Sequence, residues 1–358
     1  MKVIGLTKKK LIVLCTAVFG AVIFGIFRLI AHVNISSLPY HTVAEEWAPE
    51  GGYTHIAAYF TPDAMVEADT LKYLHYEIES KLNQESIEVD SENPSARLTA
   101  SSFLAQGSID VESPYSRASL TALGVWGDFF EFHKLELLSG GYFGDTDLNN
   151  DYCILDEEAA WKLYGSNDIA GKILYVGDIP LVIRGVFRQP DDKLSVKAGA
   201  SGMCCYVPYD YLIDHGMINN ISCYEIVMPN PVPNYALQKL REKLPVSEDK
   251  VEFVENTGRF ETIKSIKNLS GITTRAMRTR ALVYPWWENV TRVKEDRISV
   301  FSIISVSGII YALIVVIVLA VILVIQNKDV IAYWAVYLFE KVRDSIYRRL
   351  AKKEKKRL

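Results

Sequence analysis

Two long runs of apolar residues lie near the two ends of the sequence. The first, residues 11–27, contains no charged residue and is followed by Arg28 and three more apolar residues. The second, residues 300–325, is uncharged and rich in Ile and Val. A helix that crosses the hydrocarbon core of a bilayer needs about 20 apolar residues. The pattern therefore predicts two transmembrane helices, at 11–32 and at 298–326, and Arg28 is expected to extend its charged end to the headgroups.

The residues at the end of the first apolar run indicate whether it is a cleaved signal peptide. Around Ala31-His32-Val33 there is no small-x-small motif of the kind that marks a cleaved signal peptide. Cys15 follows the bulky Leu14 early in the run, which does not fit a lipoprotein signal either. We therefore expect an uncleaved signal anchor.

Between the two runs, short segments of apolar residues are separated by Pro, Gly and Asp, as is typical of strands joined by turns. Residues 33–52 contain two prolines and a Gly-Gly pair and read as a linker, so a domain is expected over 53–297. The expected strands of this domain are 53–60, 96–106, 117–125, 173–176, 181–187, 204–207, 224–228 and 251–254.

Three segments of the same region carry helical signals. Residues 61–63 (Thr-Pro-Asp) combine an N-cap hydroxyl with a proline suited to a first turn, and apolar residues then recur at steps of three and four up to Leu82. Asp156 and Gly165 frame a second helix as its N-cap and its end. A third is expected at about 235–244. Because strands and helices are mixed without strict alternation, we expect an α+β domain.

Charge is distributed unevenly along the chain. Residues 1–32 contain five Lys or Arg and no Asp or Glu, and residues 298–358 contain ten basic and four acidic residues, whereas 33–297 contain 24 basic and 39 acidic ones. Positive charges close to a span stay on the cytoplasmic side of the membrane. Both termini, as residues 1–10 and 327–358, are therefore expected in the cytoplasm of a bacterium, and the acidic domain outside its cell membrane.

The overall composition excludes several classes of protein. The chain is 49% hydrophobic and 23% charged, with a formal net charge of −4. A disordered chain would be less hydrophobic, and a protein that coats nucleic acid would carry a strong basic excess. A nucleic-acid partner is therefore not expected.

A series of short motifs follows in a fixed order through the domain. They are Leu123-Gly124-Val125, Phe129-Phe130, Gly140-Gly141-Tyr142-Phe143, Cys153-Ile154-Leu155-Asp156, Leu163-Tyr164-Gly165, Asp168–Lys172, Val182–Val186 and Val207-Pro208. Each is common alone, but their order and spacing resemble the MacB-like periplasmic core domain of ABC transporter permeases, a group that includes the MacB and FtsX types.

The resemblance implies a two-lobed α+β extracytoplasmic domain with an inserted lobe at about 111–200. It further implies a non-catalytic, permease-like subunit of an ABC-type export or mechanotransmission complex, moved by a separate ABC ATPase and accompanied by a companion permease. A peptide, a lipid or an envelope protein would be its cargo or partner. Permeases of the family usually have four spans, so this chain is expected to be a two-span form without the ATPase domain. The alternative is a membrane-anchored binding or sensory protein with no transporter.

Three segments look superficially like chemical sites. Residues 165–173 mimic a phosphate-binding loop, but the glycines are separated by five residues and Ile173 stands where a Ser or Thr belongs. The acidic segment 145–156 lacks the glycine and the final Glu of a calcium loop. Ser247 and Lys250 have an acyl-serine spacing without the partner motifs. We therefore expect no catalytic residue, no cofactor and no metal.

Cysteines of the domain face an environment in which disulfides form. Cys204 or Cys205 is a candidate to bridge to Cys223 if the strands that carry them are neighbours. Free thiols in the core are the alternative.

The segment before the second span, residues 275–297, mixes basic and aromatic side chains. Arg278 and Arg280 precede Trp286 and Trp287, a combination that suits either packing under the domain or contact with a partner or with lipid headgroups.

The segment after the second span predicts a basic amphipathic helix. Apolar residues recur on one face, and basic residues occupy the others. The apolar residues include Ile331, Trp334, Leu338 and Val342, and the basic ones include Lys341, Arg343, Arg348 and Arg349. We expect this tail to contact the inner leaflet or, by analogy with the family's permeases, an ATPase.

Overall fold

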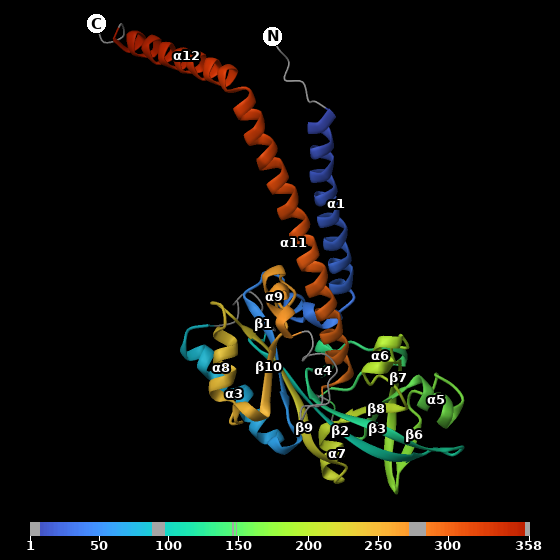
Figure 1. Ribbon diagram of the computed structural model, residues 1–358. Helices are drawn as coiled ribbons and strands as arrows, with labels where there is room; N and C mark the ends of the chain where they lie inside the picture. Colours follow the sequence, from blue (N-terminus) through green and yellow to red (C-terminus); the bar gives the residue numbers. More distant parts are fainter. Residues whose placement is uncertain (1–7, 88–96, 145–146, 148, 272–283, 355–358) are drawn as a thin grey trace. The chain divides into compact units, whose positions relative to one another are not determined.

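A computed structural model describes residues 8–87, 97–144, 147, 149–271 and 284–354 (Figure 1). The chain divides into two compact units. Asn34–Ser299 form one, called the sheet domain below, and Met1–Val33 with Val300–Leu358 form the other, called the helical unit.

One mixed sheet organises the sheet domain. Its strands run in the order β10-β1-β9-β2-β3-β8-β5-β7-β4, and β6 pairs with β2 and β7. Two neighbouring pairs, β3 with β8 and β5 with β7, are parallel, and the others are antiparallel. The strands are β1 (Tyr53–Phe60), β2 (Ala100–Glu112), β3 (Arg117–Gly127), β4 (Glu136–Gly140), β5 (Tyr152–Asp156), β6 (Ile173–Val176), β7 (Ile179–Arg188), β8 (Cys204–Pro208), β9 (Ile218–Pro229) and β10 (Val251–Glu255).

Both faces of β1 are buried. Successive side chains of a strand point to opposite faces, and on β1 Ile56, Ala58 and Phe60 belong to one apolar cluster whereas Ala57 and Tyr59 belong to another. The second half of the strand, from Ile56 to Phe60, is therefore apolar at every position rather than alternating, as in a strand covered on both faces.

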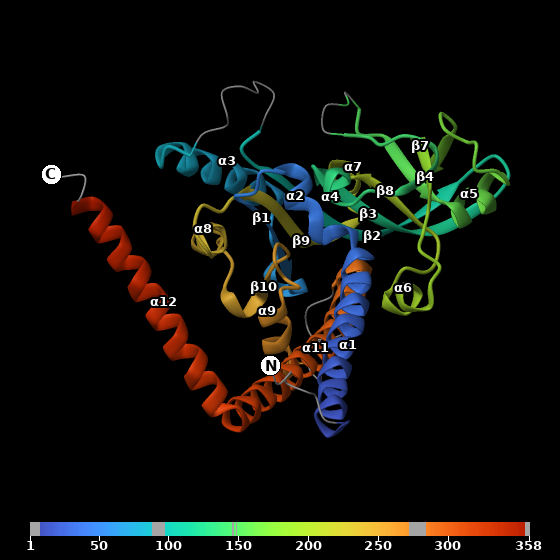
Figure 2. The same ribbon diagram turned by 90° about the horizontal axis from the view of Figure 1, so that it is seen from above.

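Helices α3 (Ala68–Gln84) and α8 (Tyr235–Lys243) cover one face at the β10–β1 end, and α5 (Glu157–Tyr164) covers it at the β7 end (Figures 1 and 2). Leu71, Leu74, Ile78 and Leu82 of α3 are fully buried there, on the apolar stripe that the sequence predicts. The other helices of the domain are α2 (Val43–Trp47), α4 (Phe129–Phe132), α6 (Lys193–Ala198), α7 (Tyr209–Asp214) and α9 (Thr262–Lys267).

The capping signals of α5 are confirmed. The Asp156 carboxylate accepts hydrogen bonds from the backbone N–H groups of Glu158 and Ala159, both at 3.2 Å. Gly165 ends the helix in the left-handed conformation, with φ of +69°. A side chain with a Cβ adopts that conformation at a cost, which explains why glycine stands here.

The expected helix start at Thr61 is wrong. Residues Pro62–Ala64 form only a 3₁₀ turn, Met65 is left-handed with φ of +47°, and α3 begins later at Ala68. Tertiary contacts hold this turn: the Thr61 N–H donates to the carbonyl of Lys250, whose ammonium in turn donates to the Asp63 carbonyl, both at 3.0 Å. A local helix signal cannot anticipate a partner nearly two hundred residues away.

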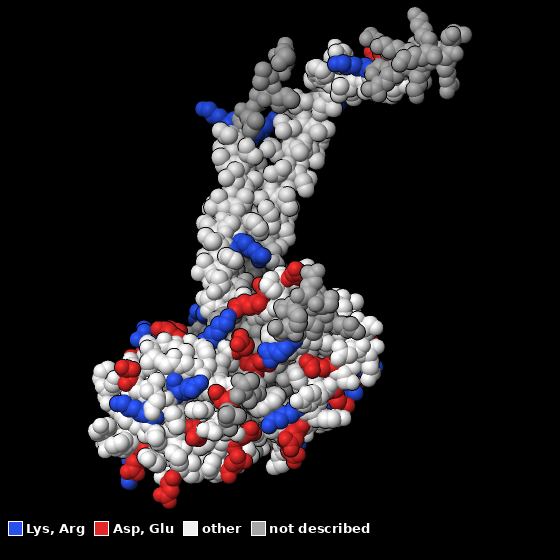
Figure 3. Space-filling view, turned by 180° about the vertical axis from the view of Figure 1, so that it is seen from behind, with Lys and Arg blue, Asp and Glu red and all other residues white. Residues whose placement is uncertain are grey.

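The helical unit consists mainly of two long helices and a third, α12 (Lys328–Glu354). Helices α1 (Lys8–Ser36) and α11 (Trp286–Gln326) are each long and apolar enough to cross a membrane. α11 starts well before residue 298, where the second span was expected to begin. Figure 3 shows that the two helices present surfaces with very few charged side chains, as lipid contact requires.

Two glycines bring α1 and α11 together. A Cβ added at Gly20 would lie 2.8 Å from the Gly308 carbonyl oxygen, and one added at Gly308 would lie 2.8 Å from the carbonyl oxygen of Gly20. Nearby, the Ser305 hydroxyl donates to the Phe24 carbonyl at 3.4 Å. Small residues at such crossings let helix backbones approach closely in a membrane.

Candidate functional site

The first turns of α11 are buried in the sheet domain although they are charged. Glu288, Arg292 and Glu295 expose 2%, 4% and 1% of their surfaces. Their spacing of four and three residues places them on one face of the helix. Buried charges are costly unless they are paired and hydrogen-bonded, so their partners decide what this face does.

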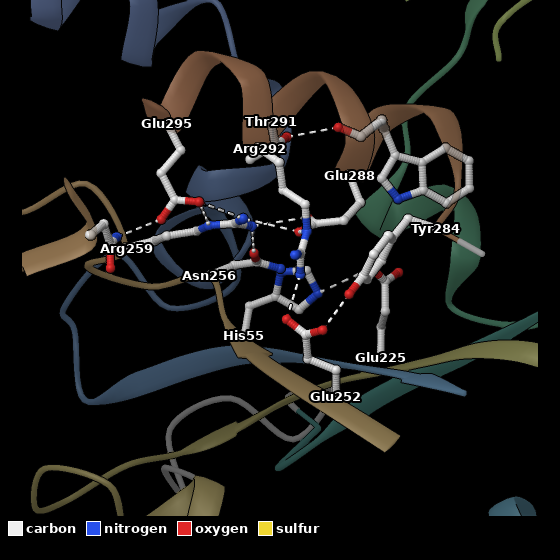
Figure 4. A network of polar contacts seen from close by, with 12 residues as sticks. His55, Glu225, Glu252, Asn256, Arg259, Tyr284, Glu288, Thr291, Arg292 and Glu295 are labelled. Atoms are coloured by element: carbon white, nitrogen blue, oxygen red, sulfur yellow. Dashed lines mark hydrogen bonds and ion pairs between the residues drawn. The ribbon is translucent and has the colours of Figure 1, made fainter. Parts of the chain in front are cut away.

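Arg259, in the loop after β10, is the centre of this group (Figure 4). Its Nη1 and Nη2 atoms donate to the two carboxylate oxygens of Glu288 at 2.9 and 3.0 Å, and Nη2 also donates to Glu295 at 2.9 Å. A further bond at 3.2 Å runs from Nη1 to the side-chain oxygen of Asn256. Such a two-pronged guanidinium–carboxylate pair is a strong and geometrically specific contact.

Arg292 ties the same helix to the edge of the sheet. Its Nε donates to Glu288 at 2.7 Å, and its Nη2 donates to Glu252 of β10 at 2.7 Å. The guanidinium lies 3.9 Å from the ring centre of Tyr284, whose hydroxyl also donates to Glu252 (Figure 4). Stacking and pairing together fix the plane of the guanidinium.

The electrostatics of this group favour the charged forms. Burial acts to raise the pKa of Glu288, but the guanidinium groups of Arg259 and Arg292 outweigh it and hold the pKa below its usual value. Burial likewise acts to raise the pKa of Glu252, and its bond to Arg292 and the Arg292 charge bring it below the usual value. We call Arg259, Arg292, Glu252, Glu288 and Glu295 the stem clamp.

A second buried pair lies on the same face of the sheet. The His133 ring nitrogen Nε2 and a Glu225 carboxylate oxygen of β9 are 2.5 Å apart, and both residues expose 3% or less of their surfaces. The Trp287 ring lies 4.5 Å from the His133 ring. Burial acts to raise the pKa of Glu225, but the charge and hydrogen bond of His133 bring it below its usual value. Trp287 of α11 thus packs on a polar pair of the sheet.

The stem clamp holds the first turns of α11 in the sheet domain. The stem clamp uses side chains of α11, of β10 and of the loop after it, and within the described residues no group of three or more His, Cys, Asp or Glu is placed to hold a metal ion. Removing one partner of a buried ion pair typically costs about 3–5 kcal/mol, because the other charge is left uncompensated. The helix therefore resists being displaced from the domain.

The aromatic residues expected at this stem lie in two different surroundings. Trp287 is 4% exposed and belongs to the apolar cluster that includes Phe129 and Tyr206, so packing accounts for it. Trp286 is partly buried and lines a cavity. Arg278 and Arg280 lie outside the described residues.

The candidate cysteine bridge is not formed, and the alternative of free thiols holds. Cys204 and Cys205 lie on β8 and Cys223 lies on β9, and these strands are separated in the sheet by β3 and β2. Three strand spacings amount to about 14 Å, whereas a disulfide needs Cα atoms within about 7 Å. All three are free thiols, and burial raises the pKa values of Cys205 and Cys223.

The predicted tail residues lie on α12. Trp334, Leu338 and Val342 expose 52–58% of their surfaces, and Ile331 exposes 44%. Lys341 and Arg343 are also exposed, and the side chains of Arg348 and Arg349 lie outside the description. This arrangement leaves the apolar face of the tail accessible to a membrane surface or to another protein, so its role stays a prediction.

A cavity of about 710 Å³ lies beside the stem clamp in the sheet domain. Its lining comes from strands β2, β3, β7 and β8, from α6 and the loops around it, and from residues 284–294. Ligand pockets commonly have volumes of about 300–1,000 Å³.

The sequence profile of the MacB-like periplasmic core domain family matches residues 19–228. The chain belongs to the MacB-like periplasmic core domain family. The match begins within α1 and ends in β9, so it covers most of the sheet and lies before every residue of the stem clamp. The order of motifs from Leu123 to Pro208 falls inside it, which confirms the resemblance and the α+β fold expected from it.

Two members of the family are similar over shorter lengths. Both are named macrolide export ATP-binding/permease protein MacB. The one from Pasteurella multocida is 25% identical over 112 residues, which are 30% of this chain and 17% of that protein. The one from Chromobacterium violaceum is 28% identical over 91 residues, 25% of this chain and 14% of that protein. The matches thus span less than a fifth of the length of these MacB proteins.

Two solved structures are also similar. The extracellular domain of the noncanonical ABC-type transporter YknZ from Gram-positive bacteria has a TM-score of 0.38 and 18% identity, covering 56% of this chain and 99% of that one. The periplasmic region of MacB from Actinobacillus actinomycetemcomitans has a TM-score of 0.37 and 13% identity, covering 59% and 92%.

Sequence reasoning missed the stem clamp. The spacing of Glu288, Arg292 and Glu295 was a usable signal, since charges on one helical face either point to solvent or pair with a partner. The residues next to Arg259 and Glu252 in the sequence give no signal that distinguishes these two partners from exposed surface charges. The helical start at Trp286 was missed as well, because Pro285 and two tryptophans read as a loop or an interface segment.

Proposed function

We propose that this chain is a non-catalytic, permease-like subunit of an ABC-type export or mechanotransmission complex, whose outer domain is moved by ATP hydrolysis in a separate subunit. One observation carries the proposal. α11 is a single helix from Trp286 to Gln326, and its first turns are held by two guanidinium groups and three carboxylates. A helix that is apolar enough to cross a membrane, and whose first turns are ion-paired within a domain, is suited to transmit a movement of its membrane part to that domain.

Family membership supports the coarser part of the proposal. Members of the family act in ABC transporter complexes with ATPases, and both MacB relatives are named as ATP-binding/permease proteins. The separate ATPase, the companion permease and the cargo are our proposal for this chain. So is the topology, with both termini in the cytoplasm of the cell and residues 33–297 outside.

We further propose that α12 is the surface on which the ATPase docks. Its apolar positions Trp334 and Leu338 lie on one face, because residues four apart are neighbours on a helix. Tyr333 and Val336 lie on the opposite side at 100° per residue. All four are exposed, so they differ in face rather than in burial.

The experiment is affinity purification of the tagged full chain from its native host in mild detergent, followed by mass spectrometry. A stoichiometric ATPase and a companion permease are expected. Deletion of 330–358, or the double change Trp334→Ala and Leu338→Ala, should release the ATPase, whereas Tyr333→Ala with Val336→Ala should retain it. Recovery of the chain alone, or only with copies of itself, would overturn the proposal.

A second candidate is a membrane-anchored binding or sensory protein. The cavity of about 710 Å³ beside the stem favours it, since its size suits a small ligand. This candidate predicts a stable chain that is purified without an ATPase and binds a ligand in the absence of ATP.

A further inference from the structure

The cavity has an apolar floor provided by four strands. Leu104 of β2, Leu123 of β3, Phe187 of β7 and Tyr206 of β8 line it, and all four belong to or pack on the same apolar cluster of one sheet face. This cluster also contains Trp287 of the stem. The floor is thus made of apolar side chains from one sheet face, with β5 between β8 and β7 in the strand order, and the polar Gln106, Thr121 and Ser222 also line the cavity.

Aromatic and small residues form part of the wall, beside polar and charged ones. Tyr284, Pro285 and Trp286 line the cavity at the start of α11, and Ala198 and Gly199 line it at the end of α6. Gly199 is left-handed, with φ of +116°, and a Cβ built on it would lie 3.7 Å from the Cβ of Trp286. Glycine here keeps the chain in a tight turn close to the tryptophan.

Most charged residues at the cavity are already paired. Lys134 pairs with Glu46, and Arg188 pairs with Glu136 and Glu157. Asp192 caps α6 by accepting from the N–H groups of Leu194 and Ser195 at 3.0 and 3.2 Å. These groups have protein partners and need no ligand.

Lys294 differs from these residues. Among the residues that the structure describes it forms no ion pair, and its ammonium donates to the Ser37 hydroxyl at 2.9 Å. Burial lowers the pKa of Lys294, and the nearby carboxylate of Asp192 only partly opposes this. An ammonium that burial destabilises, and that the Asp192 carboxylate stabilises only in part, favours the approach of a further anion.

The position of the cavity along the chain is also informative. Ser37 and Leu38 line it and directly follow α1, whereas Trp286 lines it and begins α11. The cavity is therefore lined by the residues that directly follow α1 in the sequence and by the first residues of α11.

We propose that this cavity binds a single-chain anionic lipid, with its acyl chain on the floor of Leu104, Leu123, Phe187 and Tyr206 and its headgroup at the ammonium of Lys294. The apolar floor matches the acyl chain, and Lys294, the cation of the cavity that forms no ion pair with the described residues, matches the charge of the headgroup. The volume fits one chain better than two. The inference does not rest on an ATPase partner, so a chain purified without one leaves it intact, and failure of lipid binding leaves the proposed function intact.

The experiment uses the full chain in nanodiscs of neutral phosphatidylcholine. The probe is a long-chain fatty acid that carries a diazirine at mid-chain, and cross-linked residues are mapped by mass spectrometry. Labelling is expected on 104–123, 187–206 and 284–294. Labelling of 11–33 and 300–325 reports probe dissolved in the bilayer and is the internal reference.

Three variants sharpen the test. Lys294→Ala should reduce labelling of the sheet domain about tenfold relative to the reference, because a hydrogen bond to a charged group contributes about 1.5–3 kcal/mol. Lys294→Arg should retain it, and Leu123→Trp should abolish it by filling the cavity. The matched control is Lys197→Ala. Lys197 is an exposed lysine of α6, a helix whose last residue, Ala198, lines the cavity.

Three results would overturn the proposal. The first is labelling confined to the apolar helices. The second is equal loss for Lys294→Ala and Lys197→Ala, and the third is equal labelling by a long-chain alcohol with the same diazirine. Either of the last two would show that no anion is recognised at Lys294.

Discussion

Arg259 and Glu288 form a two-pronged ion pair in which Nη1 and Nη2 lie 2.9 and 3.0 Å from the two carboxylate oxygens. The pair joins the loop after the edge strand β10 to the first turn of α11. Both side chains are buried, and Arg259 also bonds Glu295, about two turns further along the helix. Four predictions follow from this and related features.

The first prediction concerns Arg259. Arg259→Ala should lower the free energy of unfolding of the sheet domain by about 3–5 kcal/mol, since it removes the guanidinium that pairs with two buried carboxylates, Glu288 and Glu295. Chemical denaturation of the full chain in nanodiscs, followed by near-ultraviolet circular dichroism, measures this. The control is Arg117→Ala, whose partner Glu112 is exposed and whose loss should cost about 1 kcal/mol or less. Equal losses for the two variants would contradict the stem clamp.

The second prediction is the pH dependence of the stem clamp. Glu288, Glu252 and Glu225 have folded-state pKa values below their usual value. Their stabilisation is therefore fully present above the unfolded pKa of about 4.3 and is lost as the pH falls through the folded values. Glu288→Gln should be less stable than the native chain at pH 7 and should lose less stability on acidification. Parallel curves for the two proteins would show that Glu288 does not contribute.

The third prediction has the opposite sign and concerns Asp156. Burial raises its folded-state pKa to about 6, although the backbone N–H of Cys204 and two N–H groups of α5 favour the carboxylate. Stability should therefore fall as the pH rises from about 4 to 6, because the folded state holds the proton longer than the unfolded state.

Asp156→Asn removes this titration and keeps one acceptor oxygen for the cap. The free energy of unfolding of the variant, relative to that of the native chain, should be higher at pH 7 than at pH 4. Asp192→Asn is the matched control at the cap of α6, where the hydrogen bonds of Ser195 lower the pKa. It should show the reverse trend, and the same trend in both variants would contradict the assignment.

The fourth prediction tests the contact of α1 with α11. Gly20→Val should weaken it, because a Cβ there would lie 2.8 Å from the backbone oxygen of Gly308. Cross-linking between cysteines placed at Phe24 and Ser305, whose atoms meet at 3.4 Å, should fall several-fold. Gly25→Val is the control on the same helix, because its added Cβ would meet nothing within 4 Å. Undiminished cross-linking in Gly20→Val would show that the crossing lies elsewhere.

Much of the local structure was predictable because its causes are local. Tyr53–Phe60 is a strand with the bounds that its apolar run indicates, and α5 lies between the cap residues Asp156 and Gly165. The stripe of α3 is buried where its spacing predicts. Thr61 marks the limit, since its capping signal is overridden by contacts with Lys250.

The strand order was not predictable in the same way. Cys205 and Cys223 looked close enough to bridge because they lie on consecutive strands, β8 and β9, yet two strands separate them in the sheet. Pairing over such distances along the chain depends on the whole apolar pattern of the sheet rather than on any one turn.

By itself the sequence determined the features that depend on neighbours along the chain: two apolar helices, the uneven charge, the caps, most strands and the ordered motifs of the MacB-like periplasmic core domain. Only the tertiary structure decided the stem clamp and the cavity beside it. Arg259 and Glu252 look like ordinary surface charges in the sequence, and Lys294 looks like any other lysine. Their partners and their loss of water arise when distant segments pack together, and electrostatic energy depends on distance and burial in space.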